Sequence, residues 1–242
     1  MVAQMIAAVR TLIRYGRWAL LPQEARAVLR DRLTYLSPTK VRRLTNAVRQ
    51  VTQQRVPGDI LEFGIALGGS SVLLAKHATP TRQFHGFDVF GQIPPPTSER
   101  DDARSKERFA AISAGKSHGI GGDIYYGYRT DLFEGVCATL ARYGCPVGDG
   151  RVFLHKGLFE DTWPSYGRAS IAFAHIDCDW YDPVRFCLNA VMPRLAPGGI
   201  VILDDYHDYG GCRTATDEFL SEHAGFFAAD DGPNLILRRT LS

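Results

Sequence analysis

The chain has 242 residues, of which 45% are hydrophobic and 22% charged, a composition typical of a globular protein that can bury one full core. Its 28 Lys and Arg against 26 Asp and Glu leave a formal net charge of +2, and this balance argues against nucleic-acid binding through bulk charge. No apolar stretch approaches the roughly 20 residues of a membrane-spanning helix, and Arg10, Arg14 and Arg17 interrupt the apolar run that a signal peptide would need.

The first 57 residues are predicted to be helical. Apolar residues recur at helical spacing over 6–13, and Ser37 followed by Pro38 is typical of the start of a second helix. We expect this helical extension, residues 1–57, to pack against the rest of the chain and to serve as a lid or an oligomer contact. Its basic amphipathic start is a weaker indication of binding at a membrane surface.

Strands and helices alternate after residue 57. Short apolar runs typical of buried parallel strands lie at 59–63, 84–88, 152–155, 171–176 and 200–203. Helices are expected at 69–78, 130–143, 183–195 and 211–223. A closing hairpin is expected around Asp231 and Gly232, with strands at 226–229 and 234–238. This alternation predicts one α/β domain over 58–242, built on a doubly wound, mostly parallel sheet of seven strands.

Residues 91–127 interrupt this alternation. They are rich in Pro, Gly, Ser and charged residues, and they contain one short predicted helix around 103–114. Long connections inside a compact domain usually cover a functional site, so we expect this segment to do the same.

The five cysteines form no C-x-x-C pair, and their odd number does not suggest a disulfide framework. A reducing cytoplasm is therefore the expected location.

A glycine-rich turn, EFGIALGGS (62–70), joins the first predicted strand to its helix. Glycines permit a tight turn and a close approach of a ligand to the backbone at the start of a helix. The turn does not match G-x-G-x-x-G, and a ligand with a carboxylate and an amine, such as the methionyl end of S-adenosylmethionine, fits better than a pyrophosphate. Asp88, at the end of the second strand, stands where an acidic residue would bind ribose hydroxyls. The turn residues expected to bind this ligand are Glu62, Gly64, Ala66, Gly68, Ser70 and Ser71.

Two acidic clusters follow predicted strands. They are HIDCDWYDP (175–183) and the pair Asp204 and Asp205. Carboxylates at the carboxyl ends of parallel strands project into the crevice where open α/β sheets bind ligands. Three such carboxylates would repel one another unless a cation lay between them. Because Mg²⁺ prefers oxygen ligands, Asp177, Asp204 and Asp205 predict a magnesium site.

Taken together, these motifs resemble those of the macrocin O-methyltransferase (TylF-type) family. The similarity extends from about residue 36 to the C-terminus. It is carried by the blocks PGDILEFG (57–64) with GGS (68–70), GFDVFG (86–91), KGLFEDT (156–162), HIDCDWY (175–181), PGGIVILDDY (197–206) and GCRTATDEF (211–219).

The resemblance implies a Rossmann-like class I methyltransferase that transfers the methyl group of S-adenosylmethionine to a sugar hydroxyl of a glycosylated natural product, such as an antibiotic, or of a glycan. It implies Mg²⁺ held by Asp177, Asp204 and Asp205, a ribose contact at Asp88, and assembly as a homodimer or homotetramer. It also implies that Asp177 contacts the donor. Residues implied to lie near the adenine are Phe159, Asp161 and Thr162.

Two features depart from the family pattern. Tyr181, Asp182 and Pro183 stand where macrolide and aminocoumarin enzymes typically carry a Tyr-Glu-Ser or Tyr-Glu-Thr run, and the segment 91–127 has no clear counterpart. Both departures concern the acceptor rather than the chemistry. A catechol or another small diol is therefore kept as the alternative acceptor, because adjacent hydroxyls of either kind can chelate a divalent cation.

Several acidic or histidine side chains are candidates for the general base. Asp177 ranks first, with Asp179 and His207 as alternatives, the latter because an ordinary histidine pKa lies near neutrality. Asp182 is expected to cap the helix that begins near Pro183, and a cap is an equal alternative for Asp179.

Two other classes of function were weighed against methyl transfer. A nicotinamide-dependent oxidoreductase is disfavoured by the poor G-x-G-x-x-G match. A non-catalytic binding protein is disfavoured because it would gain nothing from three clustered, unpaired acids.

Overall fold

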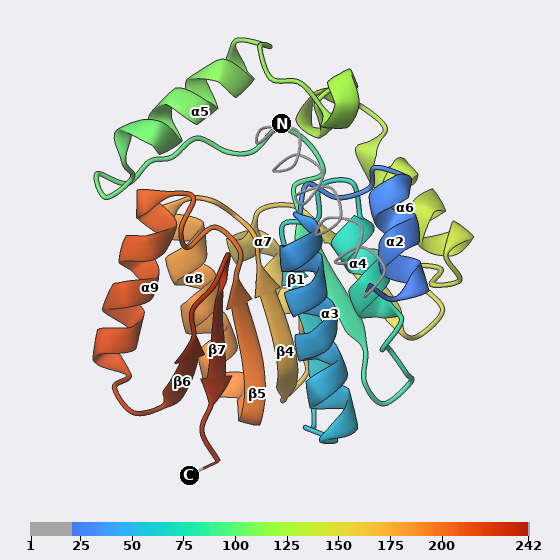
Figure 1. Cartoon of the computed structure of the whole chain (residues 1–242), viewed down its shortest axis with the longest axis vertical. Coiled ribbons are helices and arrows are strands. Elements are labelled where there is room, and N and C mark those ends of the chain that lie inside the picture. Colours follow the sequence, from blue (N-terminus) through green and yellow to red (C-terminus); the bar gives the residue numbers. More distant parts are fainter. Residues whose placement is uncertain (1–20, 242) are drawn as a thin grey trace, which may run out of the picture.

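The computed structural model describes residues 21–241. The helical stripe expected at 6–13 lies outside these residues. Within the described part, the chain forms a seven-stranded sheet with helices on both faces (Figure 1), as the alternation of predicted strands and helices requires.

The sheet is built from strands close to the predicted ones. They are β1 (Asp59–Phe63), β2 (Phe84–Asp88), β3 (Val152–Lys156), β4 (Ile171–Ile176), β5 (Leu195–Leu203), β6 (Phe227–Asp230) and β7 (Leu235–Arg239). Their order is β3-β2-β1-β4-β5-β7-β6. β1 to β5 are parallel, and β7 pairs antiparallel with both β5 and β6, which confirms the closing hairpin. The order reverses between β1 and β4, and open α/β sheets bind ligands at such a switch point.

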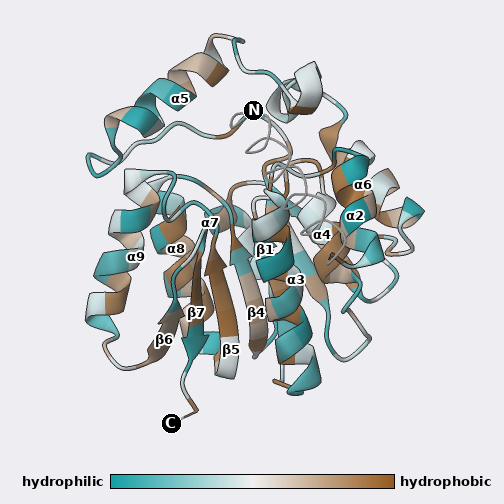
Figure 2. Ribbon diagram, in the orientation of Figure 1, coloured by the Kyte–Doolittle hydropathy of each residue, from teal (hydrophilic) through white to brown (hydrophobic). Residues whose placement is uncertain are grey.

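Helices cover both faces of the sheet. They are α2 (Gln23–Arg30), α3 (Pro38–Gln53), α4 (Gly69–Ala75), α5 (Ala103–Ser113), α6 (Leu132–Arg142), α7 (Phe159–Thr162), α8 (Tyr181–Val191) and α9 (Gly210–Glu222). One apolar cluster joins α2, α3, α4 and α6 to one face, and a second joins α8 and α9 to the other. In Figure 2 the strands between these layers are largely brown, in keeping with burial on both sides.

Helix α3 shows how the N-terminal sequence determines its own structure. The hydroxyl of Ser37 accepts a hydrogen bond from the backbone N–H of Lys40 at 3.2 Å, and Pro38 occupies the first turn, where its missing N–H costs nothing. The apolar residues of one face, Val41, Leu44, Val48 and Val51, are fully buried. They belong to the same cluster as Ile60 and Phe173 of the sheet, so α3 is part of the main core.

Several element bounds differ from the prediction, including the starts of β5 and α8, the elements next to the acidic clusters. β5 begins at Leu195 rather than at residue 200, and α8 begins at Tyr181 rather than at residue 183. The expected cap at Asp182 is wrong, because Asp182 lies inside the first turn of α8 and its carboxylate accepts a hydrogen bond from the hydroxyl of Thr97 at 2.9 Å. Proline is tolerated throughout a first helical turn, so Pro183 did not mark the first residue.

Residues 91–127, here called the cover segment, cross the carboxyl ends of the strands. In Figure 1 its helix α5 lies along the top of the molecule, above α8 and α9. Asp101 accepts a hydrogen bond from the backbone N–H of Tyr181 at 2.9 Å, and Asp102 accepts one from the N–H of Gly210 at 2.9 Å. The cover segment therefore supplies capping carboxylates to the N-termini of both α8 and α9.

None of the helices within residues 21–241 combines the length and the apolar character needed to cross a membrane.

Candidate active site

The switch point of the sheet brings together the ends of β1 and β4. Gly64 follows β1 with a φ of 89°, and its N–H bonds the carbonyl of Phe87 at 3.0 Å. A Cβ at Gly64 would overlap the carbonyl oxygen of Asp177, which follows β4. The glycine is therefore required for the close approach of these two strand ends, and the turn opens into two adjoining cavities.

Three carboxylates lie together beside this point. The register pairs Ile176 with Leu203, so the residues that follow them, Asp177 and Asp204, leave neighbouring strands side by side. Asp177, Asp204 and Asp205 each offer an oxygen, and these oxygens lie within 4.8 Å of one another. The sequence prediction that these three acids converge is thus confirmed by the geometry.

The three carboxylates differ in their surroundings. Burial and the negative charges of Asp205 and Asp204 raise the pKa of Asp177 well above its ordinary value. Burial, followed by the charge of Asp204, raises the pKa of Asp205 to about 7. The pKa of Asp204 shifts in the opposite direction. Burial favours the neutral form of this carboxyl, but its interactions with His175 and Lys40 outweigh burial and lower the pKa.

Positive and donor groups surround Asp204. The ammonium of Lys40 lies 2.8 Å from Oδ2 of Asp204 and 2.8 Å from the carboxylate of Asp208. The side-chain amide of Asn234 donates to Oδ1 of Asp204 at 3.2 Å. His175 lies beneath, with Nε2 3.9 Å from the same oxygen, which is too long for a direct hydrogen bond.

His175 is fully buried between acidic groups. Its Nδ1 bonds Glu62 at 3.0 Å, and Glu62 also accepts a hydrogen bond from the hydroxyl of Ser71. Burial opposes a charge on the imidazole, but Asp204 and Glu62 outweigh it and raise the pKa of His175 to about 10. His175 is therefore a hydrogen-bonded histidine of the core.

The donor set suits a hard divalent cation. Asp177 and Asp205 have few hydrogen-bond donors, and each carries a pKa raised by its neighbours' charge. Repulsion of this kind among clustered oxygens is relieved by a cation such as Mg²⁺, which takes carboxylate ligands and keeps other positions open.

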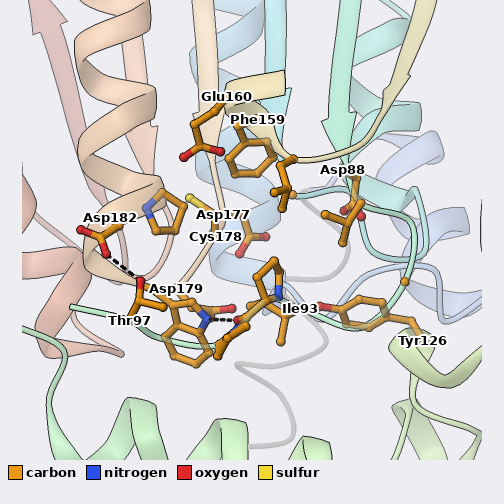
Figure 3. Close-up of a pocket in the computed structure, with 18 residues that line it drawn as sticks. Asp88, Ile93, Thr97, Tyr126, Phe159, Glu160, Asp177, Cys178, Asp179 and Asp182 are labelled. Carbon is orange, nitrogen blue, oxygen red and sulfur yellow. Dashed lines mark hydrogen bonds between the residues drawn. The ribbon is translucent and has the colours of Figure 1, made fainter. Parts of the chain in front are cut away.

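The first cavity, called the apolar cavity, has a volume of about 330 Å³ (Figure 3). In Figure 3, Asp88 and Phe159 face it from the strand ends, and Ile93 and Tyr126 face it from the cover segment. Asp88 accepts hydrogen bonds from the N–H groups of Ile65 at 2.7 Å and Phe90 at 2.6 Å, which fix its carboxylate at the rim. This arrangement fits an elongated ligand with an apolar ring and hydroxyls near Asp88.

The second cavity, called the polar cavity, has a volume of about 310 Å³. Its walls include the three clustered carboxylates, Lys40 and Tyr35 from the N-terminal region, and side chains of α5. Residues shared by both cavities are Gly64, Asp88, Tyr126, Asp177 and Asp179. A group at the end of one ligand could therefore meet a second ligand where the two cavities join.

Asp179 stands at this junction in an unusual conformation. Its φ is 60°, in the left-handed region that a non-glycine residue rarely adopts, and its N–H bonds Asp205 at 3.1 Å. No hydrogen bond from residues 21–241 reaches its carboxylate. Asp179 is not the N-terminal cap of α8, because Trp180 holds that position.

The predicted site residues divide into two groups. Those that line a cavity are Gly64, Ala66, Asp88, Phe159, Asp177, Asp179, Asp204 and Asp205. Those that lie elsewhere are Glu62, Gly68, Ser70, Ser71, Asp161, Thr162 and His207. Among the latter, His207 points its Nε2 at Asp231 of the C-terminal hairpin, at 2.7 Å.

Sequence reasoning missed the groups that come from distant parts of the chain. Lys40 precedes Asp204 by 164 positions, and no local pattern links the two. Tyr126 reaches both cavities from a segment for which only a covering role was expected. Its neighbours Tyr125 and Tyr128 form an aromatic group with it, and the YYGY run was the one signal in that segment.

A family model described as Macrocin-O-methyltransferase (TylF) matches residues 24–117 and 132–225 of this chain. These ranges include both acidic clusters and the glycine turn. They begin before residue 36 and include the cover segment up to residue 117, so the expectation that this segment has no counterpart in the family was wrong for 91–117.

Individual relatives agree with the family match. The chain is 31% identical over 186 residues to 8-demethyl-8-(2,3-dimethoxy-alpha-L-rhamnosyl)-tetracenomycin-C 4'-O-methyltransferase of Streptomyces olivaceus, a match covering 74% of this chain and 65% of that protein. It is 27% identical over 197 residues to mycinamicin III 3''-O-methyltransferase of Micromonospora griseorubida, covering 78% of this chain and 71% of the relative. The match thus spans about two thirds of each relative's length.

Among solved structures, the O-methyltransferase NovP superimposes with a TM-score of 0.70 at 23% sequence identity. The superposition covers 86% of this chain and 82% of NovP, and it shows that the two share a fold.

Proposed function

Because this chain belongs to the macrocin O-methyltransferase family, we propose that it transfers the methyl group of S-adenosylmethionine to a hydroxyl of a sugar, within a glycosylated natural product or glycan. The observation that carries the proposal is the group of three carboxylates within 4.8 Å, next to the junction of two cavities. The relatives that methylate sugar-bearing natural products support the same class of acceptor.

The apolar cavity is assigned to the donor. Gly64 lines this cavity with bare backbone, against which the methionyl end would lie, and Asp88 would receive the ribose hydroxyls. Phe159 and Leu158, after β3, offer apolar surface to the adenine. The sulfonium methyl would then point toward Asp177 and Asp179, where the polar cavity begins.

Asp177, Asp204 and Asp205 would hold Mg²⁺. When bound, the cation supplies a Lewis acid that makes an acceptor hydroxyl easier to deprotonate. Lys40 bonds Oδ2 of Asp204 and Asn234 bonds its Oδ1, so that this carboxylate keeps a fixed orientation. The donor methyl group and the acceptor hydroxyl would be held next to each other in the adjoining cavities. Such proximity and alignment lower an activation barrier by about 7–11 kcal/mol in favourable cases.

Transfer forms a bond between the hydroxyl oxygen and the methyl carbon while the carbon–sulfur bond breaks, and the hydroxyl proton must leave. Asp179 is the best-placed acceptor for this proton, because it lines both cavities and is free of the cluster of three acids. Burial and the charge of Asp205 raise its pKa well above the ordinary value, which makes its ionised form a stronger base. Asp177 is thus assigned to the metal rather than to proton transfer, and His207 is directed at Asp231.

Methyl transfer from labelled S-adenosylmethionine to matched glycosides and catechols, with and without a chelator, tests the proposal. We expect turnover of a glycoside that a chelator abolishes and that Mg²⁺ restores.

Asp204→Asn should lose about 100-fold or more in kcat while the affinity for S-adenosylhomocysteine changes little, because the missing charge belongs to the three carboxylates assigned to the metal. Asp131→Asn, an exposed acid outside both cavities, is the control. Wild-type turnover by Asp204→Asn would refute the metal assignment. A preference for catechols over glycosides would show that the acceptor is a catechol and not a sugar.

A further inference from the structure

Two arginines of the cover segment line the polar cavity together with the acids. Arg104 and Arg108 both line that cavity and stand four positions apart on α5, a spacing that places them on one helix face. Asp177, Asp204 and Asp205 line the same cavity. The cavity is therefore lined by both acidic and basic side chains.

Both guanidinium groups are held in place and form no ion pair, although Arg108 is near enough to Asp179 for its charge to favour the ionised form of that carboxylate. Arg104 lies over the ring of Tyr209, with 5.4 Å from its Cζ to the ring centroid, and Arg108 lies over Tyr125 at 5.3 Å. Arg108 also donates to the hydroxyl of Ser117 at 2.8 Å. Stacking of this kind orients a planar guanidinium and leaves most of its N–H edge free for an anion.

The absence of an ion pair holds for the whole described chain. No Asp or Glu side chain of residues 21–241 lies within the 4.0 Å of an ion pair from either guanidinium, and residues 1–20 contain no acidic residue. By contrast, Arg100, just before α5, is paired with Glu218. Lys40, the other cation of the cavity, is bound to Asp204 and Asp208.

We propose that Arg104 and Arg108 bind a phosphate of the acceptor, so that the sugar is methylated while it is linked to a phosphate, as in a nucleoside diphosphate sugar. Two stacked guanidinium groups one turn apart match a group with several anionic oxygens better than a single carboxylate. The polar cavity, about 310 Å³, also lies at the lower end of the range for ligand sites, about 300–1,000 Å³, which suits a sugar phosphate better than a complete glycosylated macrocycle.

This inference rests on the proposed methyl transfer to a sugar hydroxyl, and it replaces the glycosylated acceptor with a sugar linked to phosphate. A sugar phosphate bound in this cavity would present a hydroxyl to the three carboxylates while its phosphate meets Arg104 and Arg108. Methylation would then precede glycosyl transfer, and a glycosyltransferase reaction would consume the methylated product.

The test is binding of UDP, dTDP and inorganic pyrophosphate by calorimetry, to the full chain saturated with S-adenosylhomocysteine and with EDTA present to exclude metal-bridged contacts. We expect at least one probe to bind the wild type, and each of Arg104→Gln and Arg108→Gln to weaken it about tenfold or more. Lys106→Gln is the matched control, since it removes the same charge from α5 at an exposed position that lines neither cavity. The affinity of Lys106→Gln for the same probes should stay within about twofold of the wild-type value.

The outcomes separate this inference from the proposed function. Absence of binding, equal affinity in all variants, or binding of glucuronate in preference to every phosphate probe would overturn the phosphate assignment. Affinity for S-adenosylhomocysteine should be the same in wild type and variants, which also shows that the variants are folded. Should S-adenosylhomocysteine itself fail to bind, the methyltransferase proposal falls, whatever the phosphate probes show. Both arginine variants should also raise KM for a nucleoside diphosphate sugar while leaving KM for the corresponding methyl glycoside unchanged.

Discussion

The side chain of Lys40 connects helix α3 with Asp204, one of the three clustered carboxylates. Lys40 of α3 bonds both Oδ2 and the backbone carbonyl of this residue, at 2.8 and 2.9 Å. The acids themselves were predictable, because each follows an apolar strand and parallel strands end at the same edge of a sheet. Lys40 was not, since an amphipathic helix pattern specifies the buried face of α3 but not what a lysine at the margin of that face will contact.

A second residue-scale feature is a pair of neutral histidines between β2 and β3. Nδ1 of His85 lies 3.0 Å from Nε2 of His155, and His155 in turn contacts the hydroxyl of Ser165 at 3.0 Å. Burial and the proximity of His155 lower the pKa of His85 to about 3. Burial also lowers the pKa of His155. Both shifts favour the uncharged form of the rings in the folded chain.

A pH dependence of stability follows from the lowered pKa of His85. Between pH 6.5 and 3 the unfolded chain binds a proton at this position that the folded chain excludes, so stability falls as the pH is lowered through that window. From pH 7.5 to pH 5, this contributes about 2 kcal/mol of lost unfolding free energy.

Urea denaturation at the two pH values checks this expectation. His85→Gln should reduce the loss of stability between pH 7.5 and pH 5, whereas His118→Gln, at an exposed position, should not change it. An unchanged pH dependence in His85→Gln would show that this ring does not resist protonation.

At the scale of elements, the attachment of the cover segment is the main feature that the sequence did not reveal. Its length and composition predicted a cover with one short helix, and α5 confirms that helix. The contacts of Asp101 and Asp102 with the first residues of α8 and α9 link positions about 80 and 108 apart. Such pairings depend on the packing of whole elements, and helix propensity carries no information about them.

The glycines at the start of α9 are necessary for this attachment. A Cβ at Gly211 would overlap Oδ1 of Asp101, and one at Gly210 would come within 2.7 Å of Oδ2 of Asp102. Gly211→Ala should therefore displace Asp101, speed proteolytic cleavage within residues 91–127 and raise KM for the acceptor severalfold.

Gly135→Ala provides the matched control, because Gly135 lies within α6 and a Cβ there meets no atom within 4 Å. It should leave cleavage unchanged and stabilise the fold by about 0.5–1 kcal/mol. Equal cleavage rates in Gly211→Ala and the wild type, measured by limited proteolysis, would show that the segment is held by other contacts.

At the scale of the whole molecule, the fold follows closely from the sequence. All seven strands were expected, the five parallel ones because each is a short apolar run and the last two because Asp231 and Gly232 indicate a hairpin turn. The five-residue error at the start of β5 has a local cause: APGG (196–199) has the composition of a turn, yet it continues the strand from Leu195 after an irregularity in the pairing with β4.

The described part of the N-terminal extension packs into the core and reaches the polar cavity. Ala25 and Val28 of α2 are fully buried, and Tyr35 lines the polar cavity. We propose that residues 1–35 shape the acceptor side or contact a second copy of the chain. Deleting them should change acceptor KM or oligomeric state, while the affinity for S-adenosylhomocysteine changes by less than about threefold. Acceptor kinetics and sedimentation velocity, compared with a chain lacking only residues 1–20, would measure this, and identical behaviour of both truncations and the full chain would contradict it.

The central claim is that side chains from two neighbouring strand ends share one divalent cation beside the donor. Diffraction data from crystals grown with S-adenosylhomocysteine and Mn²⁺, collected at an energy where manganese scatters anomalously, test it most directly. The account predicts one strong anomalous peak bonded to oxygens of Asp177, Asp204 and Asp205, with the donor product in the adjoining apolar cavity. A peak elsewhere, or these carboxylates turned away from one another around an empty centre at saturating Mn²⁺, would contradict it.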